Sequence, residues 1–179
     1  MKNTANIITI SRIFIAVWLI FIKPLSPCFY ILYTVCGLTD MIDGTVARIT
    51  NTQSKTGALL DSVADMVFCT VAAVKLLPTA FSVMPDWIYA VILLVLTIRT
   101  AAYVTGFLKY HKFASRHTYL NKLTGFALFI VPYFLNARIV WVIAAFLAVI
   151  SAGEELIMNM KLKQFEPDRK SIITLRSVD

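Results

Sequence analysis

Two apolar segments carry acidic residues in their interior: LTDMIDGTVAR at residues 38–48 and GALLDSVAD at residues 57–65. Asp40 and Asp43 are three positions apart, and Asp61 and Asp65 are four apart. Each spacing places both members of the pair on one face of an α-helix. We therefore expect two helices whose acidic faces converge on one cavity.

The surroundings of these aspartates are those of a membrane protein. Hydrophobic residues make up 59% of the 179 residues, well above the roughly 45–50% apolar content of soluble domains. The mean hydropathy is +0.76. At roughly 2.5–3.5 kcal/mol each, four ionised carboxylates at membrane depth would cost on the order of 10 kcal/mol. Hard divalent cations bound by oxygen ligands offset this cost and the mutual repulsion. We expect one or two Mg²⁺ or Mn²⁺ ions at Asp40, Asp43, Asp61 and Asp65.

Turn formers and charge clusters divide the chain into six apolar segments, each near the roughly 20 residues that a transmembrane helix needs. The predicted spans are residues 6–23, 27–48, 57–77, 87–108, 120–135 and 139–160. The expected fold is an all-α integral membrane protein, with six transmembrane helices and a polar cavity open to the cytoplasmic side. This six-span domain would cover residues 1–160, and residues 161–179 would form a polar cytoplasmic tail.

Basic residues give the predicted orientation. Most of the 17 Lys and Arg residues fall on one side of the six-span plan. With the N-terminus in the cytoplasm, Lys23, Lys75 and Arg138 fall outside and Arg99 falls within the fourth span. This asymmetry follows the positive-inside rule and predicts that both termini are cytoplasmic. The net charge of +7 lies in short segments between spans, so we expect it to face anionic lipid and not nucleic acid.

Small and basic residues accompany the aspartate pairs. Gly44, Ala47 and Gly57 remove side chains where a ligand could approach the backbone, although small residues also let membrane helices pack closely. Arg48 offers a planar guanidinium suited to phosphate, or it could be an ordinary positive-inside anchor. Together with carboxylates and metal, these residues describe a pyrophosphate site.

The fixed positions follow the pattern D-x2-D-G-x2-A-R-x8-G-x3-D-x3-D from Asp40 to Asp65. This pattern resembles the complete signature of the CDP-alcohol phosphotransferase family. The resemblance implies that the four aspartates bind the metal and that Asp65 is also the base that deprotonates the acceptor hydroxyl. It also implies a CDP-binding site. The residues of that site would be Asn6, Thr9, Gly44, Ala47, Arg48, Ser54, Thr56 and Gly57.

The implied reaction moves a phosphatidyl group from CDP-diacylglycerol to a small alcohol and releases CMP, as in phospholipid biosynthesis. Glycerol 3-phosphate is the leading acceptor, with Arg99 and Lys122 as candidate ligands. Arg99 lies too deep to be a surface anchor, but it could pair with an aspartate, and Lys122 could simply snorkel. The resemblance further implies a homodimer. We also expect the protein to lie in the plasma membrane of a bacterium or archaeon.

The acceptor remains open between several small alcohols. Some relatives that bind phosphorylated acceptors are similar to one another in having a basic residue in the last helix. Here that span carries Glu154 and Glu155, and its basic residues begin at Lys161. Serine, inositol and inositol phosphate are therefore alternative acceptors.

Other readings of the acidic cluster compete with the enzyme. A structural ion pair would need enough buried cations, and Arg48 and Arg99, taken as the basic residues well placed within the spans, are too few for four carboxylates. A divalent-cation transporter would need polar residues that continue across the membrane, but outer segments such as 91–96 and 140–148 are apolar. An inactive scaffold is disfavoured because the signature is whole.

Overall fold

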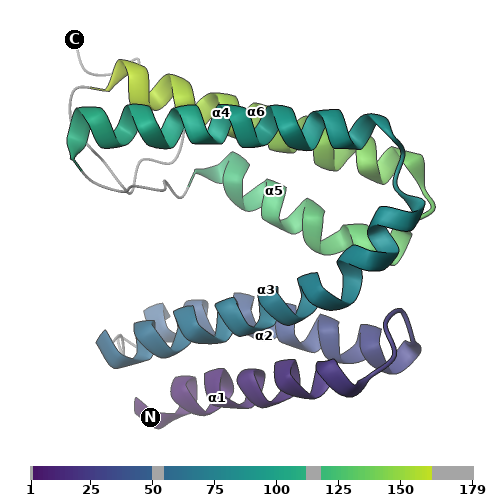
Figure 1. Ribbon diagram of the computed structural model, residues 1–179. Helices are drawn as coiled ribbons and strands as arrows, with labels where there is room; N and C mark the ends of the chain where they lie inside the picture. Colours follow the sequence, from purple (N-terminus) through teal and green to yellow (C-terminus); the bar gives the residue numbers. More distant parts are fainter. Residues whose placement is uncertain (1, 50–54, 112–117, 163–179) are drawn as a thin grey trace. The chain divides into compact units, whose positions relative to one another are not determined.

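The computed structural model describes residues 2–49, 55–111 and 118–162, with side chains for 9–40, 57, 59–111 and 118–162. Every element in these residues is helical, which confirms the predicted all-α class (Figure 1). The chain divides into two compact units, Met1–Ser82 and Val83–Asp179. Of the predicted tail at residues 161–179, residues 163–179 lie outside the described residues.

The first unit consists of α1 (Lys2–Trp18), the 3-10 turn η1 (Leu19–Phe21), α2 (Pro27–Ile49) and α3 (Lys55–Val83). Helix α2 begins after Ser26, whose Oγ accepts a hydrogen bond from Phe29 N at 3.2 Å. Pro27 is the first helical residue, a position where a missing N–H leaves no bond unmade. Helices α1 and α2 pack against each other, and the buried Ala16 and Cys36 are small enough to let them approach closely.

Helix α3 contacts both α2 and the 3-10 turn η1 that follows α1. Its Phe68 ring lies 5.4 Å from the ring of Tyr33 on α2, measured between centroids. Its Lys75 Nζ donates a hydrogen bond to Ile20 O in η1 at 2.6 Å. These contacts hold the middle of α3 against α2 and η1, and two of the aspartates lie on α3 before them.

The third span does not end where it was predicted to end. The sequence indicated a stop at residue 77, before Pro78, but α3 continues through this proline to Val83. A proline removes one hydrogen bond of the helix. Within an apolar environment the surrounding residues still gain by remaining helical, because no water is present to bond an unwound backbone.

The second unit consists of α4 (Trp87–Tyr110), α5 (Tyr119–Ile130), the 3-10 turn η2 (Val131–Phe134) and α6 (Arg138–Lys161). Helix α6 packs against both α4 and α5 (Figure 1). Gly106 of α4 makes room for the buried Asn159 of α6, because a Cβ at Gly106 would lie 3.2 Å from Asn159 Nδ2. That Nδ2 donates to Ala102 O at 2.9 Å, so the two helices are joined by a buried hydrogen bond.

The fifth span also differs from its prediction. Residues 120–135 were expected to be one helix, but the α-helix ends at Ile130 and a 3-10 turn follows. Pro132 lacks the N–H that would continue the α-helical ladder, which accounts for the change. At the start of α5, the Thr118 side chain accepts a hydrogen bond from Asn121 N at 3.2 Å, as an N-cap does.

Three helical segments of the described residues are long and apolar enough to cross a membrane. They are Leu59–Val83, Trp87–Tyr110 and Arg138–Lys161, and Thr9–Phe21 is a shorter apolar segment. Large apolar side chains stand exposed on the helices, for example Phe14 at 72% and Phe21 at 80%. Surfaces of this kind fit lipid better than water. The chain is therefore a membrane protein, and the six-span plan stays a prediction.

Candidate active site

Three carboxylates converge in the first unit from two helices. Asp40 comes from α2, and Asp61 and Asp65 come from successive turns of α3. One carboxylate oxygen from each lies within 4.8 Å of the others. The expected meeting of two acidic helix faces is therefore observed for three of the four aspartates.

A guanidinium from α1 joins these carboxylates. Arg12 Nη1 lies 2.6 Å from Asp40 Oδ1. Arg12 Nη2 lies 2.6 Å from Asp61 Oδ1 and 3.0 Å from Asp65 Oδ1. The Arg12 side chain is completely buried, whereas the three carboxylates are 40–48% exposed. The cluster thus has a buried side, occupied by the guanidinium, and a side open to a ligand.

Local packing explains how Arg12 reaches this position. Thr9 and Ala16 lie one turn before and one turn after Arg12 on α1, and all three are buried. Across from them, Cys36 Sγ on α2 lies 4.0 Å from Arg12 O. Small side chains on both helices allow a close approach. A long side chain between them can therefore extend along the interface toward α3.

The cluster fits a divalent cation. Mg²⁺ binds oxygens at about 2.0–2.1 Å, so two ligands on opposite sides of one ion are about 4.2 Å apart. Oxygens already within 4.8 Å of one another need a small side-chain adjustment to reach that spacing. Among the described residues, the three carboxylates outnumber the guanidinium by two negative charges, so a further cation is needed to balance them. An all-oxygen ligand set favours Mg²⁺ or Mn²⁺ over softer metals.

The remaining predicted residues of this site are described less fully. Thr9 is buried on α1, and Gly57 lies in the first turn of α3. Five other predicted residues lie within helices, but their side chains lie outside the described residues. They are Asn6 of α1, Asp43, Gly44, Ala47 and Arg48 of α2. Thr56 likewise lies within a helix, α3, and its side chain is outside the described residues. Ser54 lies outside the described residues altogether.

Arg12 is the residue that the sequence reasoning missed. The ion-pair alternative was rejected with Arg48 and Arg99 counted as the well-placed basic residues, and that count was wrong because Arg12 pairs with three aspartates. A signal was present, since Arg12 lies inside the first predicted span and a charge there is functional by default. It was overlooked because it was counted only as one of the basic residues on the cytoplasmic side.

A second polar cluster lies in the other unit. Arg99 Nη1 of α4 lies 3.4 Å from Glu155 Oε2 of α6, and Arg99 Nη2 donates to Asn121 Oδ1 of α5 at 3.0 Å. Within the described residues, the ion-pair partner of Arg99 is thus a glutamate, whereas the alternative to its predicted role as an acceptor ligand was a pair with an aspartate. Glu154 and Glu155 are both buried. Lys122, next to Asn121, is exposed on α5.

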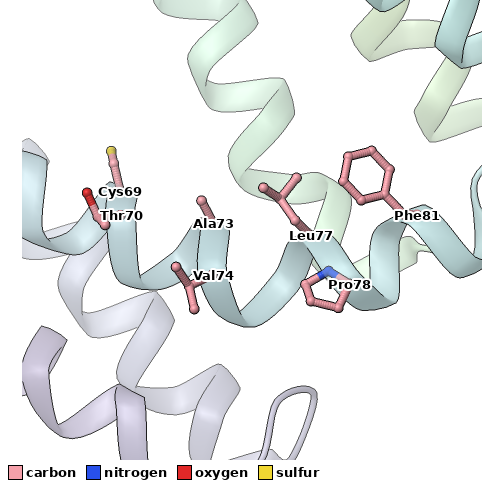
Figure 2. A pocket seen from close by; sticks show the side chains of 7 residues that line it. All are labelled: Cys69, Thr70, Ala73, Val74, Leu77, Pro78 and Phe81. Atoms are coloured by element: carbon pink, nitrogen blue, oxygen red, sulfur yellow. The ribbon is translucent and has the colours of Figure 1, made fainter.

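An apolar hollow lies on α3 beyond Asp65 (Figure 2). Its volume is about 570 Å³. The lining residues are Cys69, Thr70, Ala73, Val74, Leu77, Pro78 and Phe81. Four of them follow Asp65 at intervals of four positions, so each side chain lies about one helical turn beyond the last. The apolar surface therefore begins one turn from the carboxylate cluster.

Comparison with known proteins adds to this geometry. The chain matches the CDP-alcohol phosphatidyltransferase family over residues 2–153. A CDP-diacylglycerol–glycerol-3-phosphate 3-phosphatidyltransferase from Cereibacter sphaeroides is 33% identical to the chain over 97 residues. That alignment covers 51% of the chain and 43% of the relative, so the chain spans less than half of the relative's length. No solved structure matches the chain.

Proposed function

Because the chain belongs to the CDP-alcohol phosphatidyltransferase family, we propose that it transfers a phosphatidyl group from CDP-diacylglycerol to a small alcohol and releases CMP. The observation that carries the proposal is the convergence of Asp40, Asp61 and Asp65 within 4.8 Å among apolar helices. Such a concentration of negative charge suits a site that binds cations and a diphosphate.

The metal centre of the proposed enzyme consists of Asp40, Asp61 and Asp65, together with Asp43 one turn beyond Asp40 on α2. These residues would hold one or two Mg²⁺ or Mn²⁺ ions, which neutralise the diphosphate and the departing CMP when bound. The open side of the cluster, where the carboxylates are 40–48% exposed, is the side from which donor and ion enter.

Asp65 is proposed as the general base. The acceptor hydroxyl oxygen attacks the phosphorus that carries the diacylglycerol group, and a new P–O bond forms. The P–O bond to the CMP phosphate breaks, CMP leaves with the electron pair, and the hydroxyl proton passes to Asp65. Asp65 makes the longest of the three ion pairs, at 3.0 Å, and is the most exposed of the carboxylates. Both features leave it available to take a proton.

The donor site is proposed along the same helices. Asn6, Thr9, Ser54 and Thr56 would bind the nucleotide, and Arg48 would bind a phosphate. Three small residues, Gly44, Ala47 and Gly57, would let the donor approach the backbone. The apolar hollow on α3 would accommodate an acyl chain of the donor, because it begins one turn from Asp65 and continues away from it.

Glycerol 3-phosphate is proposed as the acceptor, which is also the acceptor in the name of the Cereibacter sphaeroides relative. Arg99 and Lys122 are the candidate ligands for its phosphate. Asn121 and Glu155 hold the Arg99 guanidinium, and a guanidinium has five N–H donors, more than these two contacts require. A six-span topology with both termini in the cytoplasm, and a homodimer, complete the proposal.

The test is CMP release by the full chain in detergent with CDP-diacylglycerol and Mg²⁺ or Mn²⁺. The acceptor panel contains glycerol 3-phosphate, serine, inositol and inositol phosphate. We expect release with glycerol 3-phosphate, loss of release in EDTA and restoration by either ion. A panel in which no acceptor supports CMP release would contradict the substrate class, and release with another acceptor alone would correct the choice of acceptor.

Asp65→Asn tests the proposed base. Positioned general bases contribute about 10²–10⁴-fold to rate, and Asp65 also binds metal, so we expect kcat to fall by at least the upper part of that range. Asp86→Asn is the matched control, because Asp86 is an exposed aspartate that makes no side-chain cap bond at the start of α4. Persistence of full CMP release in Asp65→Asn would exclude Asp65 as the base.

A further inference from the structure

Arg12 occupies a position that a simple metal site does not require. Its guanidinium contacts Oδ1 of Asp40, Asp61 and Asp65 at 2.6, 2.6 and 3.0 Å, from the buried side of the cluster. A carboxylate has two oxygens and about four acceptor positions. The guanidinium and a metal ion can therefore bind the same three groups at the same time, from opposite sides.

The guanidinium has a role of its own when metal is absent. Three carboxylates with oxygens within 4.8 Å would repel one another in a helical bundle of low polarity. Arg12 offsets that repulsion and joins α1 to α2 and α3 by charge-assisted contacts. The cluster can therefore stay assembled before an ion binds.

The same charge acts against the ion when it arrives. With Nη–O distances of 2.6–3.0 Å and metal–oxygen distances of about 2.1 Å, the two cations would be separated by about 5–7 Å, depending on which carboxylate oxygen binds the metal. Even at the dielectric constant of water, about 80, repulsion between charges of +1 and +2 at about 5–7 Å corresponds to about a tenfold change in Kd.

We infer that Arg12 is a positioning residue that serves as the resident counter-cation of the metal site. It holds Asp40, Asp61 and Asp65 together in the metal-free protein and weakens the binding of the divalent ion. The guanidinium and the ion thus stabilise the same cluster and oppose each other. This inference rests on the proposed function, because it concerns the metal centre of that site.

The test measures metal affinity and thermal stability, neither of which depends on turnover. Mn²⁺ alone is titrated into the full chain in detergent and followed by electron paramagnetic resonance, and Tm is recorded in EDTA and in saturating Mn²⁺. For Arg12→Gln we expect a lower Tm in EDTA, a larger rise in Tm with Mn²⁺, and a Kd for Mn²⁺ that falls about tenfold. Arg12→Lys keeps the charge and should keep a Kd close to that of the unmodified chain.

Lys75→Gln is the matched control. Lys75 also joins α3 to the α1 region, through its bond to Ile20 O at 2.6 Å, but it lies ten positions beyond Asp65, about 15 Å along the helix. A role of Arg12 in helix attachment alone would make the two variants behave alike. We expect Lys75→Gln to lower Tm with and without Mn²⁺ and to leave the Kd unchanged.

A second variant covers the case in which Arg12→Gln does not fold. Arg12→Gln combined with Asp61→Asn removes one negative charge along with the positive one, and it should regain much of the Tm lost in EDTA. A double variant no more stable than Arg12→Gln would overturn the counter-cation role.

The outcomes separate this inference from the proposed function. If Mn²⁺ does not bind the unmodified chain, the metal centre itself is wrong, and the inference falls with it. If Mn²⁺ binds the unmodified chain but Arg12→Gln binds it equally well or more weakly, the metal centre stands and the opposing role of Arg12 is overturned.

Discussion

Arg99 can serve the fold, the acceptor or both, and a pair of variants separates these roles. Its Nη1 lies 3.4 Å from Glu155 Oε2. At an effective dielectric constant of about 20, opposite charges at that distance attract by about 5 kcal/mol. Much of this attraction offsets the cost of taking two charges out of water. Removing Arg99 alone leaves Glu155, 4% exposed, as a buried charge that has lost its cation.

We expect Arg99→Met to lower the free energy of unfolding by about 3 kcal/mol, the low end for a broken buried pair, because Arg99 itself is 22% exposed. The double variant Arg99→Met, Glu155→Met should regain most of this loss, since apolar residues of similar size often replace a buried ion pair without loss of stability. Unfolding in mixed detergent micelles measures both values.

Activity distinguishes the two roles. If Arg99 binds the acceptor phosphate, KM for glycerol 3-phosphate should rise about 10- to 100-fold in both variants, because a hydrogen bond to a charged group contributes about 1.5–3 kcal/mol. The KM for CDP-diacylglycerol should not change. A double variant that regains both its stability and its KM for glycerol 3-phosphate would refute the acceptor role and leave Arg99 as a structural residue.

Two further predictions concern helix packing and the donor. Gly106→Val should lower the free energy of unfolding by about 2 kcal/mol, because the larger side chain overpacks against Asn159. Gly125→Val is the control: an added Cβ there meets nothing within 4 Å, so the free energy of unfolding should fall by less in the same assay. Ala73→Trp should fill the hollow on α3 and raise KM for a long-chain donor more than for a short-chain donor. Ala90→Trp, at an exposed position of α4, is the control. An equal rise in KM for both donors would argue against an acyl chain in the hollow.

Much of the helical plan could be predicted from the sequence. All six predicted segments contain an α-helix, and the segment at 27–48 differs from α2 (Pro27–Ile49) by one residue. Ser26 and Pro27 account for this accuracy, because a capping hydroxyl and a first-turn proline act through local geometry. The two wrong helix ends, near Pro78 and after Ile130, arose because they depend on more than local geometry. A proline inside an apolar segment can continue or end a helix, and the surroundings of that turn decide the outcome.

The candidate site divides in the same way. The spacing of Asp61 and Asp65 on one turn of helix was sufficient to predict that they share a face, and Asp40 was expected to meet them. The partner of each charge was not predictable to the same degree. Arg12 was overlooked although it contacts three aspartates. Arg99 was predicted as an acceptor ligand, with an aspartate partner as the alternative, and it lies beside Glu155.

The sequence by itself determined that the chain is helical and apolar, which segments contain its helices and which helix faces carry negative charge, because these properties depend on hydropathy and on periodicity within one segment. Tertiary structure alone decided which cation stands against which carboxylate, because Arg12 and Asp61 are 49 positions apart in the chain and meet only through the packing of separate helices. The charge balance of the site, and with it the expected opposition between Arg12 and a metal ion, follows from that packing.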